Sequence, residues 1–168
     1  MTALRIGSWT APDDGVHRIT PDDWAVWRDL RLSALTDAPE AFGSVFADWK
    51  DADEHRWRRR LEDLTFNAVA VVDGTPVGQV SGADPDGTGG VDVTSMWVSP
   101  HSRGTGTADA LIRAVADWAL RGDAVALRLS VRATNSRAIS FYERVGFTHA
   151  GEPGDEPTEI SMWWSLAP

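Results

Sequence analysis

Two glycines one residue apart precede an apolar, alanine-rich run, in the segment Arg103-Gly104-Thr105-Gly106-Thr107-Ala108. A helix that starts here would offer unpaired N–H groups and the positive end of its dipole, and both attract phosphate. Glycine also allows an oxygen-rich ligand to approach the backbone closely, and Arg103 adds positive charge at the rim. The segment is therefore either a phosphate cradle or a plain turn that leads into a core helix.

Three phosphate-binding patterns compete for this segment. A P-loop needs four residues between its glycines and then lysine with serine or threonine, and the segment has neither feature. A dinucleotide fingerprint needs a third glycine where Asp109 stands, and a carboxylate beside phosphates is unfavourable. The third pattern, Arg/Gln-x-x-Gly-x-Gly/Ala, fits residues 103–108 at every position.

A second motif lies downstream, in the stretch NSRAISFYERVGF. It reads Asn135-x-x-Ala138-x-x-Phe141-Tyr142-x-x-x-Gly146-Phe147. With both motifs in this order and at this distance, the sequence resembles the GCN5-related N-acetyltransferases (the GNAT family). The motifs and the strand before them cover roughly residues 91–147, and the order of elements extends the resemblance along most of the chain.

The resemblance implies a site for acetyl-CoA. It assigns the pyrophosphate of the cofactor to the glycine segment, namely Arg103, Gly104, Thr105, Gly106, Thr107 and Ala108. It assigns the pantetheine arm to the backbone of Met96, Trp97 and Val98, with the Val98 amide as a candidate oxyanion donor. Asn135 is expected both to cap its helix and to contact the pantetheine side. No metal is expected, because the four histidines are scattered without the spacing of ligands.

Acetyl transfer from a thioester needs a neutral amine and a proton for the leaving thiolate. By resemblance Tyr142 is the general acid, and it is the only tyrosine in a chain with nine tryptophans and five phenylalanines. The alternative is a core aromatic whose hydroxyl finds a partner. Many relatives carry a glutamate where Asp92 stands, so Asp92 is the candidate general base, acting through a water, unless it is a solvated strand residue.

The resemblance places the acceptor site near two early helices and the loop between them. Their tryptophans are expected mostly in the core; these are Trp24, Trp27, Trp49 and Trp57. Within the loop stretch PEAFGS, Phe42 and Ser44 are candidate substrate-binding residues. The basic stretch EHRWRRR is expected to be a solvated helical face rather than a nucleic-acid patch.

Periodicity and turn signals predict the elements that position these residues. Strands are expected at 16–20, on both sides of a turn within 67–83, at 91–98, at 125–133 and at 157–166, and helices at 20–35, 46–64, 104–121 and 135–146. The fold class is therefore α/β (α+β), and the resemblance implies a mixed, mostly antiparallel central sheet flanked by helices and splayed between strands 4 and 5. One acetyltransferase domain is expected over residues 1–168, with 1–15 either poorly ordered or an extra N-terminal strand segment.

Composition excludes several classes of protein. The absence of cysteine excludes disulfides and a thiol nucleophile, and it suits the cytoplasm. Twenty-five acidic residues against 16 basic ones give a net charge of −9, which argues against nucleic acid and tilts towards a cationic small molecule. No apolar run is long enough to predict a membrane span.

These observations together predict a cytoplasmic N-acetyltransferase, that is, an acyltransferase that uses acetyl-CoA. It would move the acetyl group directly to a primary amine of a small molecule in a ternary complex, without a covalent enzyme intermediate. Two alternatives stay open: a protein N-terminus or lysine as acceptor, and a non-catalytic acyl-CoA-binding module. The edge strands also leave a homodimer open.

Overall fold

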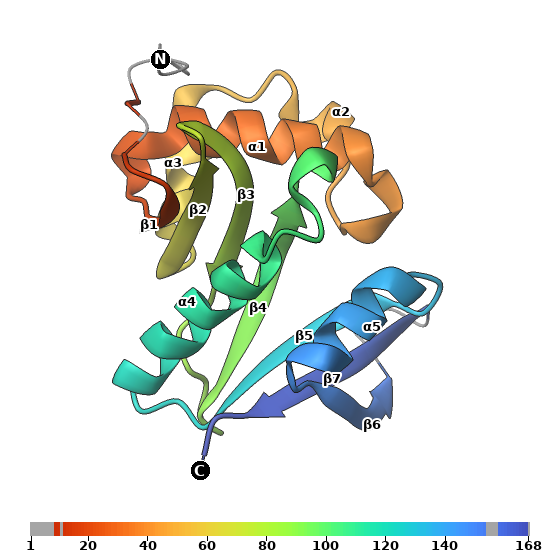
Figure 1. The fold of residues 1–168 in the computed structure, drawn as a ribbon. Coiled ribbons are helices and arrows are strands. Elements are labelled where there is room, and N and C mark those ends of the chain that lie inside the picture. The colour runs from red at the N-terminus through yellow and green to blue at the C-terminus, as the bar shows by residue number, and fades with distance from the viewer. Residues whose placement is uncertain (1–8, 11, 154–157, 168) are drawn as a thin grey trace.

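The computed structural model describes residues 9–10, 12–153 and 158–167. A seven-stranded sheet with the order β1-β2-β3-β4-β5-β7-β6 forms the centre of the molecule, and helices pack on its faces (Figure 1). The strands are β1 (Gly15–Arg18), β2 (Phe66–Val72), β3 (Thr75–Gly82), β4 (Gly90–Val98), β5 (Ala126–Arg132), β6 (Thr148–Pro153) and β7 (Glu159–Ser165). The helices are α1 (Trp24–Asp37), α2 (Phe46–Trp49), α3 (Glu54–Glu62), α4 (Thr107–Arg121) and α5 (Ser136–Val145), with short 3-10 turns η1 (Pro21–Asp23), η2 (Pro39–Ala41) and η3 (Pro100–Ser102).

Strands β4 and β5 pair over a very short length. They are the one parallel pair among the described strands, and their register covers only Gly90–Asp92 against Ala126–Arg128. Beyond this point the two strands diverge, so the sheet opens into a V whose base lies near the C-terminus (Figure 1). The predicted mixed, mostly antiparallel sheet with a splay between strands 4 and 5 is confirmed.

Local sequence signals account for several of the boundaries. Asp73 and Gly74 both have positive φ (50° and 71°), as a two-residue hairpin turn between β2 and β3 requires. The Thr20 side chain accepts from the backbone of η1 while the Asp23 carboxylate accepts from the Thr20 N–H at 2.8 Å, which closes a capping box before α1. The Asn135 side chain caps α5, accepting from the Ala138 N–H at 3.2 Å.

Two parts of the fold differ from the sequence prediction. The single helix expected over residues 46–64 is two helices, α2 and α3, because Asp53 adopts an extended conformation and caps a new helix by accepting from the Arg56 N–H at 2.9 Å. Strand β6 was not predicted, because THAGEP contains glycine and proline and forms a strand only by pairing with β7. The expectation for residues 1–15 falls mainly on 1–8 and 11, outside the described residues.

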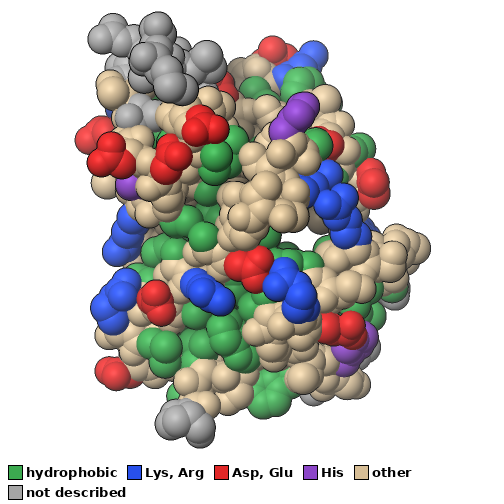
Figure 2. Space-filling view, viewed as in Figure 1, with side chains coloured by type: hydrophobic (Ala, Val, Ile, Leu, Met, Phe, Trp, Pro, Cys, Tyr) green, Lys and Arg blue, Asp and Glu red, His purple; other side chains and the backbone are tan. Residues whose placement is uncertain are grey.

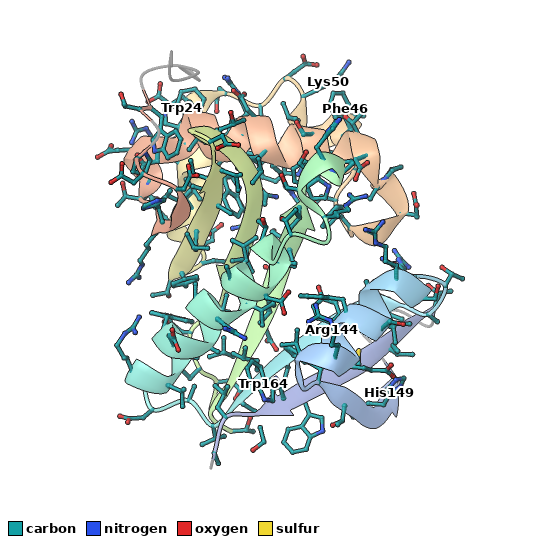
Figure 3. The ribbon with its side chains drawn as sticks, viewed as in Figure 1. Trp24, Phe46, Lys50, Arg144, His149 and Trp164 are labelled. Carbon is teal, nitrogen blue, oxygen red and sulfur yellow. The ribbon has the colours of Figure 1, made fainter. Side chains whose placement is uncertain are left out.

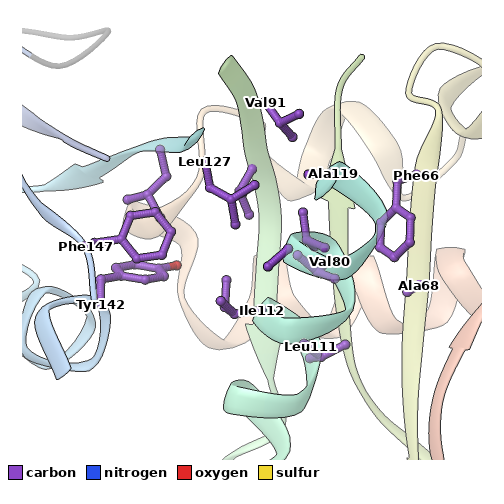
Figure 4. Packing of buried hydrophobic residues seen from close by; sticks show 14 of the residues in the cluster. Phe66, Ala68, Val80, Val91, Leu111, Ile112, Ala119, Leu127, Tyr142 and Phe147 are labelled. Atoms are coloured by element: carbon purple, nitrogen blue, oxygen red, sulfur yellow. The ribbon is translucent and has the colours of Figure 1, made fainter. Parts of the chain in front are cut away.

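Two hydrophobic cores lie on opposite faces of the sheet. Neighbouring residues of β2 alternate between them: Ala68 and Ala70 join the core under α4, and Val69 joins the core under α1 and α3. The first core continues across the base of the V to Tyr142 and Phe147 (Figure 4). α4 and the α1/α3 pair therefore bury both faces of β2 and β3. No helix in the described part of the chain is long and apolar enough to cross a membrane.

The α4 core makes a stability prediction. Leu111 is fully buried, whereas Leu120 on the same helix is 48% exposed. Leu111→Ala is expected to lower the free energy of unfolding by about 2–5 kcal/mol, because the lost side chain leaves a cavity. Leu120→Ala, the matched control, is expected to change it by less than about 0.5 kcal/mol. Urea denaturation of both variants measures the difference, and equal losses would contradict the described packing.

Candidate active site

A cleft of about 470 Å³ lies inside the V between β4 and β5. In the space-filling view it is a hollow between the two halves of the molecule, with charged side chains along its rim (Figure 2). Nine of the residues expected from the sequence line it, contributed by the loop after α1, by β4, by the glycine segment and by α5. They are Phe42, Met96, Trp97, Val98, Arg103, Gly104, Ala108, Asn135 and Tyr142.

The glycine segment forms the turn between η3 and α4. Gly104 and Gly106 have φ of 75° and 87°, in the left-handed region that favours glycine, and α4 therefore starts at Thr107 rather than at 104. A Cβ built on either glycine would meet no protein atom within 4 Å, so the space beside both residues is open. Thr105, between them, is held by its hydroxyl, which donates to the Ser102 carbonyl. An open, positive-φ turn at a helix start fits the pyrophosphate of acetyl-CoA.

The end of β4 offers free backbone to the cleft. The Ser99 N–H donates to the Val77 carbonyl at 2.7 Å, on the β3 side, and Val98 lies opposite Gly78 in the register. In an antiparallel ladder this makes Gly78–Val98 a non-hydrogen-bonded pair, so the N–H and C=O of Val98 point away from β3. The Val98 carbonyl accepts from Arg103 Nε at 3.0 Å. Its N–H is directed into the opening between β4 and β5. The family resemblance assigns the pantetheine arm and the developing oxyanion to this position.

Tyr142 faces the same cleft from α5. Its ring packs between Phe141 and Phe147, with centroid distances of 5.2 and 5.5 Å, and the hydroxyl is turned towards β4 (Figure 4). No residue in the described ranges forms a hydrogen bond with that hydroxyl, although the residue is only 9% exposed. Burial raises the pKa of the phenol well above its ordinary value. The group therefore stays protonated at neutral pH and is available as a hydrogen donor.

Arg103 joins the cofactor side of the cleft to the end of α1. Its guanidinium forms an ion pair with the Asp37 carboxylate, which also accepts from the Trp97 indole N–H at 3.0 Å. These contacts, with the Trp97 bond as the largest cause, lower the pKa of Asp37 from its ordinary value of 3.8. Asp37 thus connects α1 to both β4 and the glycine segment.

Two further contacts bridge the open V. Arg132 Nε at the end of β5 donates to the Glu40 carbonyl in η2 at 3.0 Å. Arg144 on α5 extends towards α4 (Figure 3), where it forms a two-pronged ion pair with Asp109 at 3.0 and 3.1 Å. These contacts connect the two halves of the molecule across the opening, where β4 and β5 no longer pair.

Two of the predicted site residues lie elsewhere. Asp92 is at the base of the V, where β4 and β5 still pair, and its carboxylate accepts from Arg128 Nε at 3.0 Å. Its side chain is 56% exposed and does not line the cleft, so this placement does not support its expected role as general base. Ser44 also does not line the cleft. Thr105, Gly106 and Thr107 lie in the glycine turn, directly beside lining residues.

Sequence reasoning missed several lining residues. Asp37, Glu40 and Arg132 contact the cleft, and the first two belong to the loop TDAPEAFGS that separates the early helices. The break of helical periodicity in that loop was the available signal. Nothing in the sequence pairs Arg132 with Glu40, because they are 92 residues apart. No cluster of potential metal ligands occurs among the residues that the structure describes.

Comparison with known proteins identifies the class to which this fold and cleft belong. The sequence pattern described as "Acetyltransferase (GNAT) family" matches residues 24–147, so the chain belongs to the GNAT family. N-acetylaspartate synthetase from Danio rerio is 36% identical over 87 residues, which are 52% of this chain and 31% of that protein. The chain therefore matches less than a third of that relative's length.

Solved structures share the fold at low sequence identity. An acetyltransferase of the GNAT family from Streptococcus pneumoniae has a TM-score of 0.74 at 16% identity, over 92% of this chain and 100% of that one. PaiA N-acetyltransferase from Thermoplasma acidophilum, in complex with coenzyme A, has a TM-score of 0.72 at 13% identity, over 92% and 99%. These similarities confirm the predicted fold.

The contacts of Asp37 predict a pH-dependent contribution to stability. Because the folded state lowers the pKa of this carboxyl, its contribution is fully present above the ordinary pKa of 3.8 and is lost as pH falls through the lowered value. Asp37→Asn is expected to be less stable than the unmodified protein at pH 7, by about 1 kcal/mol after allowance for solvent screening. Chemical denaturation from pH 7 to pH 3 should show this gap narrowing. Asp117→Asn, at an exposed position on α4, is the control, and a gap that stays constant with pH would contradict the argument.

Proposed function

We propose that the protein is an acetyl-CoA-dependent N-acetyltransferase that acetylates a primary amine of a small molecule directly, in a ternary complex. The observation that carries the proposal is the protonated hydroxyl of Tyr142, which forms no hydrogen bond with any described residue, on the cleft that Gly104 and the end of β4 also line. A purely structural tyrosine in a core satisfies its hydroxyl. Membership of the GNAT family supports the same reaction class.

The residues of the cleft have distinct proposed roles. The pyrophosphate would be held by the turn at Gly104 and Gly106, by the start of α4 and by Arg103. The N–H of Val98 would donate to the thioester carbonyl oxygen, on which negative charge develops during the reaction. When bound, acetyl-CoA supplies a thioester: a bond forms from the amine nitrogen to the acetyl carbon, the C–S bond breaks, and coenzyme A leaves as the thiol. Tyr142 donates its proton to the sulfur and regains one from the amine through water, which balances the reaction.

Arg103 would have to exchange partners when anions enter the cleft. Its guanidinium is held by Asp37 and by the Val98 carbonyl, both within the same site. A pyrophosphate would compete with Asp37 for this guanidinium, because phosphate oxygens accept charged hydrogen bonds from arginine as a carboxylate does. Cofactor binding is thereby coupled to the end of α1, next to the proposed acceptor side.

A small acceptor is proposed for the side of the cleft near Phe42, where the bridge from Arg132 to Glu40 spans the opening. The similarity to proteins named N-acetylaspartate synthetase supports a free amino acid amine as one acceptor class. A protein N-terminus or lysine is the second candidate, supported by the net charge of −9, which would attract basic protein tails.

Release of free thiol tests the function. The protein is incubated with acetyl-CoA and, in separate reactions, with amino acids, polyamines, aminoglycosides and basic peptides. We expect thiol release with at least one small amine and formation of its N-acetyl product by mass spectrometry. Release with peptides alone would support the protein acceptor instead. Tight acetyl-CoA binding with no release for any acceptor would support a non-catalytic acyl-CoA-binding module.

Tyr142→Phe tests the proposed general acid. The variant keeps the ring packing and removes only the unpartnered hydroxyl, so the thermal midpoint and the affinity for coenzyme A are expected to stay unchanged. The maximal rate is expected to fall at least about tenfold, because the leaving sulfur loses its proton donor. Steady-state kinetics with the best acceptor measure this. An unchanged maximal rate would remove Tyr142 from the mechanism.

Asp92→Asn tests the alternative base. Because the carboxylate pairs with Arg128 and lies outside the cleft, we expect the variant to keep the pH–rate profile of the unmodified enzyme. The amine would then lose its proton to water in the cleft. If the pH–rate profile of the variant lost its alkaline plateau, or if its acidic limb shifted, Asp92 would again be the candidate general base, acting through a water.

A further inference from the structure

Arg31 is a buried cation for which the described part of the chain supplies no polar partner. It lies on the inward face of α1, is 8% exposed, and forms no hydrogen bond or ion pair with any residue in the described ranges. Its guanidinium carbon lies 4.6 Å from the centre of the Phe42 ring, and this is its one specific contact in that part of the chain. A guanidinium removed from water in this way is costly unless something supplies negative charge.

Arg60 on α3 lies beside Arg31. One of its terminal nitrogens donates to Ser95 Oγ at 2.9 Å and to Ser81 Oγ at 3.4 Å, and the other is buried without a partner. Its guanidinium carbon is 5.4 Å from the Trp27 ring. Two arginines from different helices therefore approach the same region with nitrogen donors unused.

Polar groups of the sheet complete this cluster. Gln79 on β3 is fully buried, and among the described residues neither its amide oxygen nor its amide nitrogen has a hydrogen-bond partner. It lies opposite Trp97 in the register, at the bulge where Ser95 has a φ of 56°. We call Arg31, Arg60, Gln79 and Ser95 the arginine pocket. Its members come from α1, α3, β3 and β4, on the face of the sheet that α1 and α3 cover, and they offer both hydrogen-bond donors and acceptors.

The electrostatics of the arginine pocket are uncompensated. Burial is the main cause that lowers the pKa of Arg31 to about 10, and the charge of Arg60 adds to it. Burial also lowers the pKa of Arg60, while the negative charge of Asp63 opposes this at longer range. No carboxylate among the described residues forms an ion pair with either arginine. An entering anion would therefore gain both charge neutralisation and hydrogen bonds.

The arginine pocket is linked to the cleft through Phe42 and Trp97, and none of its four members itself lines the cleft. Phe42 and Trp97 both line the cleft. Arg31 stacks on the Phe42 ring, and Gln79 lies opposite Trp97 on the adjacent strand. The pocket is on the α1/α3 face, whereas the glycine turn leads into α4 on the opposite face. A ligand that reached from the thioester position past Phe42 would thus meet the guanidinium of Arg31.

We propose that the arginine pocket binds a carboxylate of the amine acceptor, so that the acceptor is an amino acid or a related amino-carboxylate. This inference rests on the proposed acetyltransferase function and narrows its substrate class. A guanidinium fork matches the two oxygens of a carboxylate, and Gln79 and Ser95 can complete the hydrogen bonds. Polyamines are disfavoured, because they would bring further positive charge next to Arg31 and Arg60, despite the net negative charge of the chain.

The first experiment compares acceptors that differ only in the carboxylate. Each proteinogenic amino acid is assayed beside its methyl ester and its decarboxylated amine, with thiol release as the measure. For the amino acid that reacts best, kcat/KM is expected to exceed that of its ester and its amine by about 10- to 100-fold. This is the factor that corresponds to the loss of one charged hydrogen-bonded pair. Esters or amines that match or exceed every acid would overturn the proposal.

The second experiment removes the charges. Arg31→Met and Arg60→Met are expected to abolish the preference for the acid over its ester, mainly through KM, and Arg31→Lys to restore part of it. Arg59→Met, at an exposed neighbouring position on α3, is the matched control and is expected to keep the preference. Without acceptor, Arg31→Met is expected to keep or raise the thermal midpoint, because it replaces an unpaired buried cation with an apolar side chain. A lowered midpoint with an unchanged acid preference would assign Arg31 a structural role and overturn the proposal.

A binding measurement separates this proposal from the proposed function. The N-acetyl derivatives of the same amino acids are titrated calorimetrically into the protein and into Arg31→Met. Binding that depends on Arg31, in a protein that releases no thiol with any acceptor, would keep the carboxylate site and overturn the transferase. Acetylation of amines with a rate that Arg31→Met leaves unchanged would keep the transferase and overturn the carboxylate site.

Discussion

The divergence of β4 from β5 is the constraint on which the rest of the structure depends. Only three residues of β4 pair with β5, so at the end of β4 the backbone groups on the β5 side have no partner strand. Arg103 satisfies the Val98 carbonyl, and the Val98 N–H is left facing the opening. The bridges from Arg132 and Arg144 span the opening. The cleft is thus the space left where the backbone bonds of a continuous sheet are missing.

Charge acts on two length scales in this molecule. The net charge of −9 is spread over an exposed surface, where water and salt screen it over about 10 Å. Arg31 lies within the protein and is screened little, so its unpaired charge dominates the chemistry of the nearest groups. For this reason the overall acidity, which favours a cationic ligand, and the arginine pocket, which favours an anionic group, point to different acceptors. Because the buried charge is screened less than the surface charge, it has the larger effect on which acceptor binds.

The reliable sequence predictions concern groups that interact within a few residues. The turn at Asp73-Gly74 and the cap of Asn135 depend on neighbours two or three positions away, and both are present as expected. The helix expected over 46–64 was wrong because a second local signal, the cap at Asp53, competes with continued helical periodicity. Strand β6 was missed because its composition disfavours a strand and only the β7 ladder stabilises it.

By itself the sequence determined the glycine turn, the helix that carries Tyr142, and the order of strand, turn and helix between them, because dihedral preferences and caps are local properties. Tertiary structure alone decided which charges meet. Asp92 has its partner 36 residues away in Arg128, and Arg103 has its partner 66 residues away in Asp37. The absence of a described partner for the buried Arg31 follows from the packing of α1, α3 and the sheet together. Burial removes the water that would otherwise screen these charges, and burial exists only once the elements are packed.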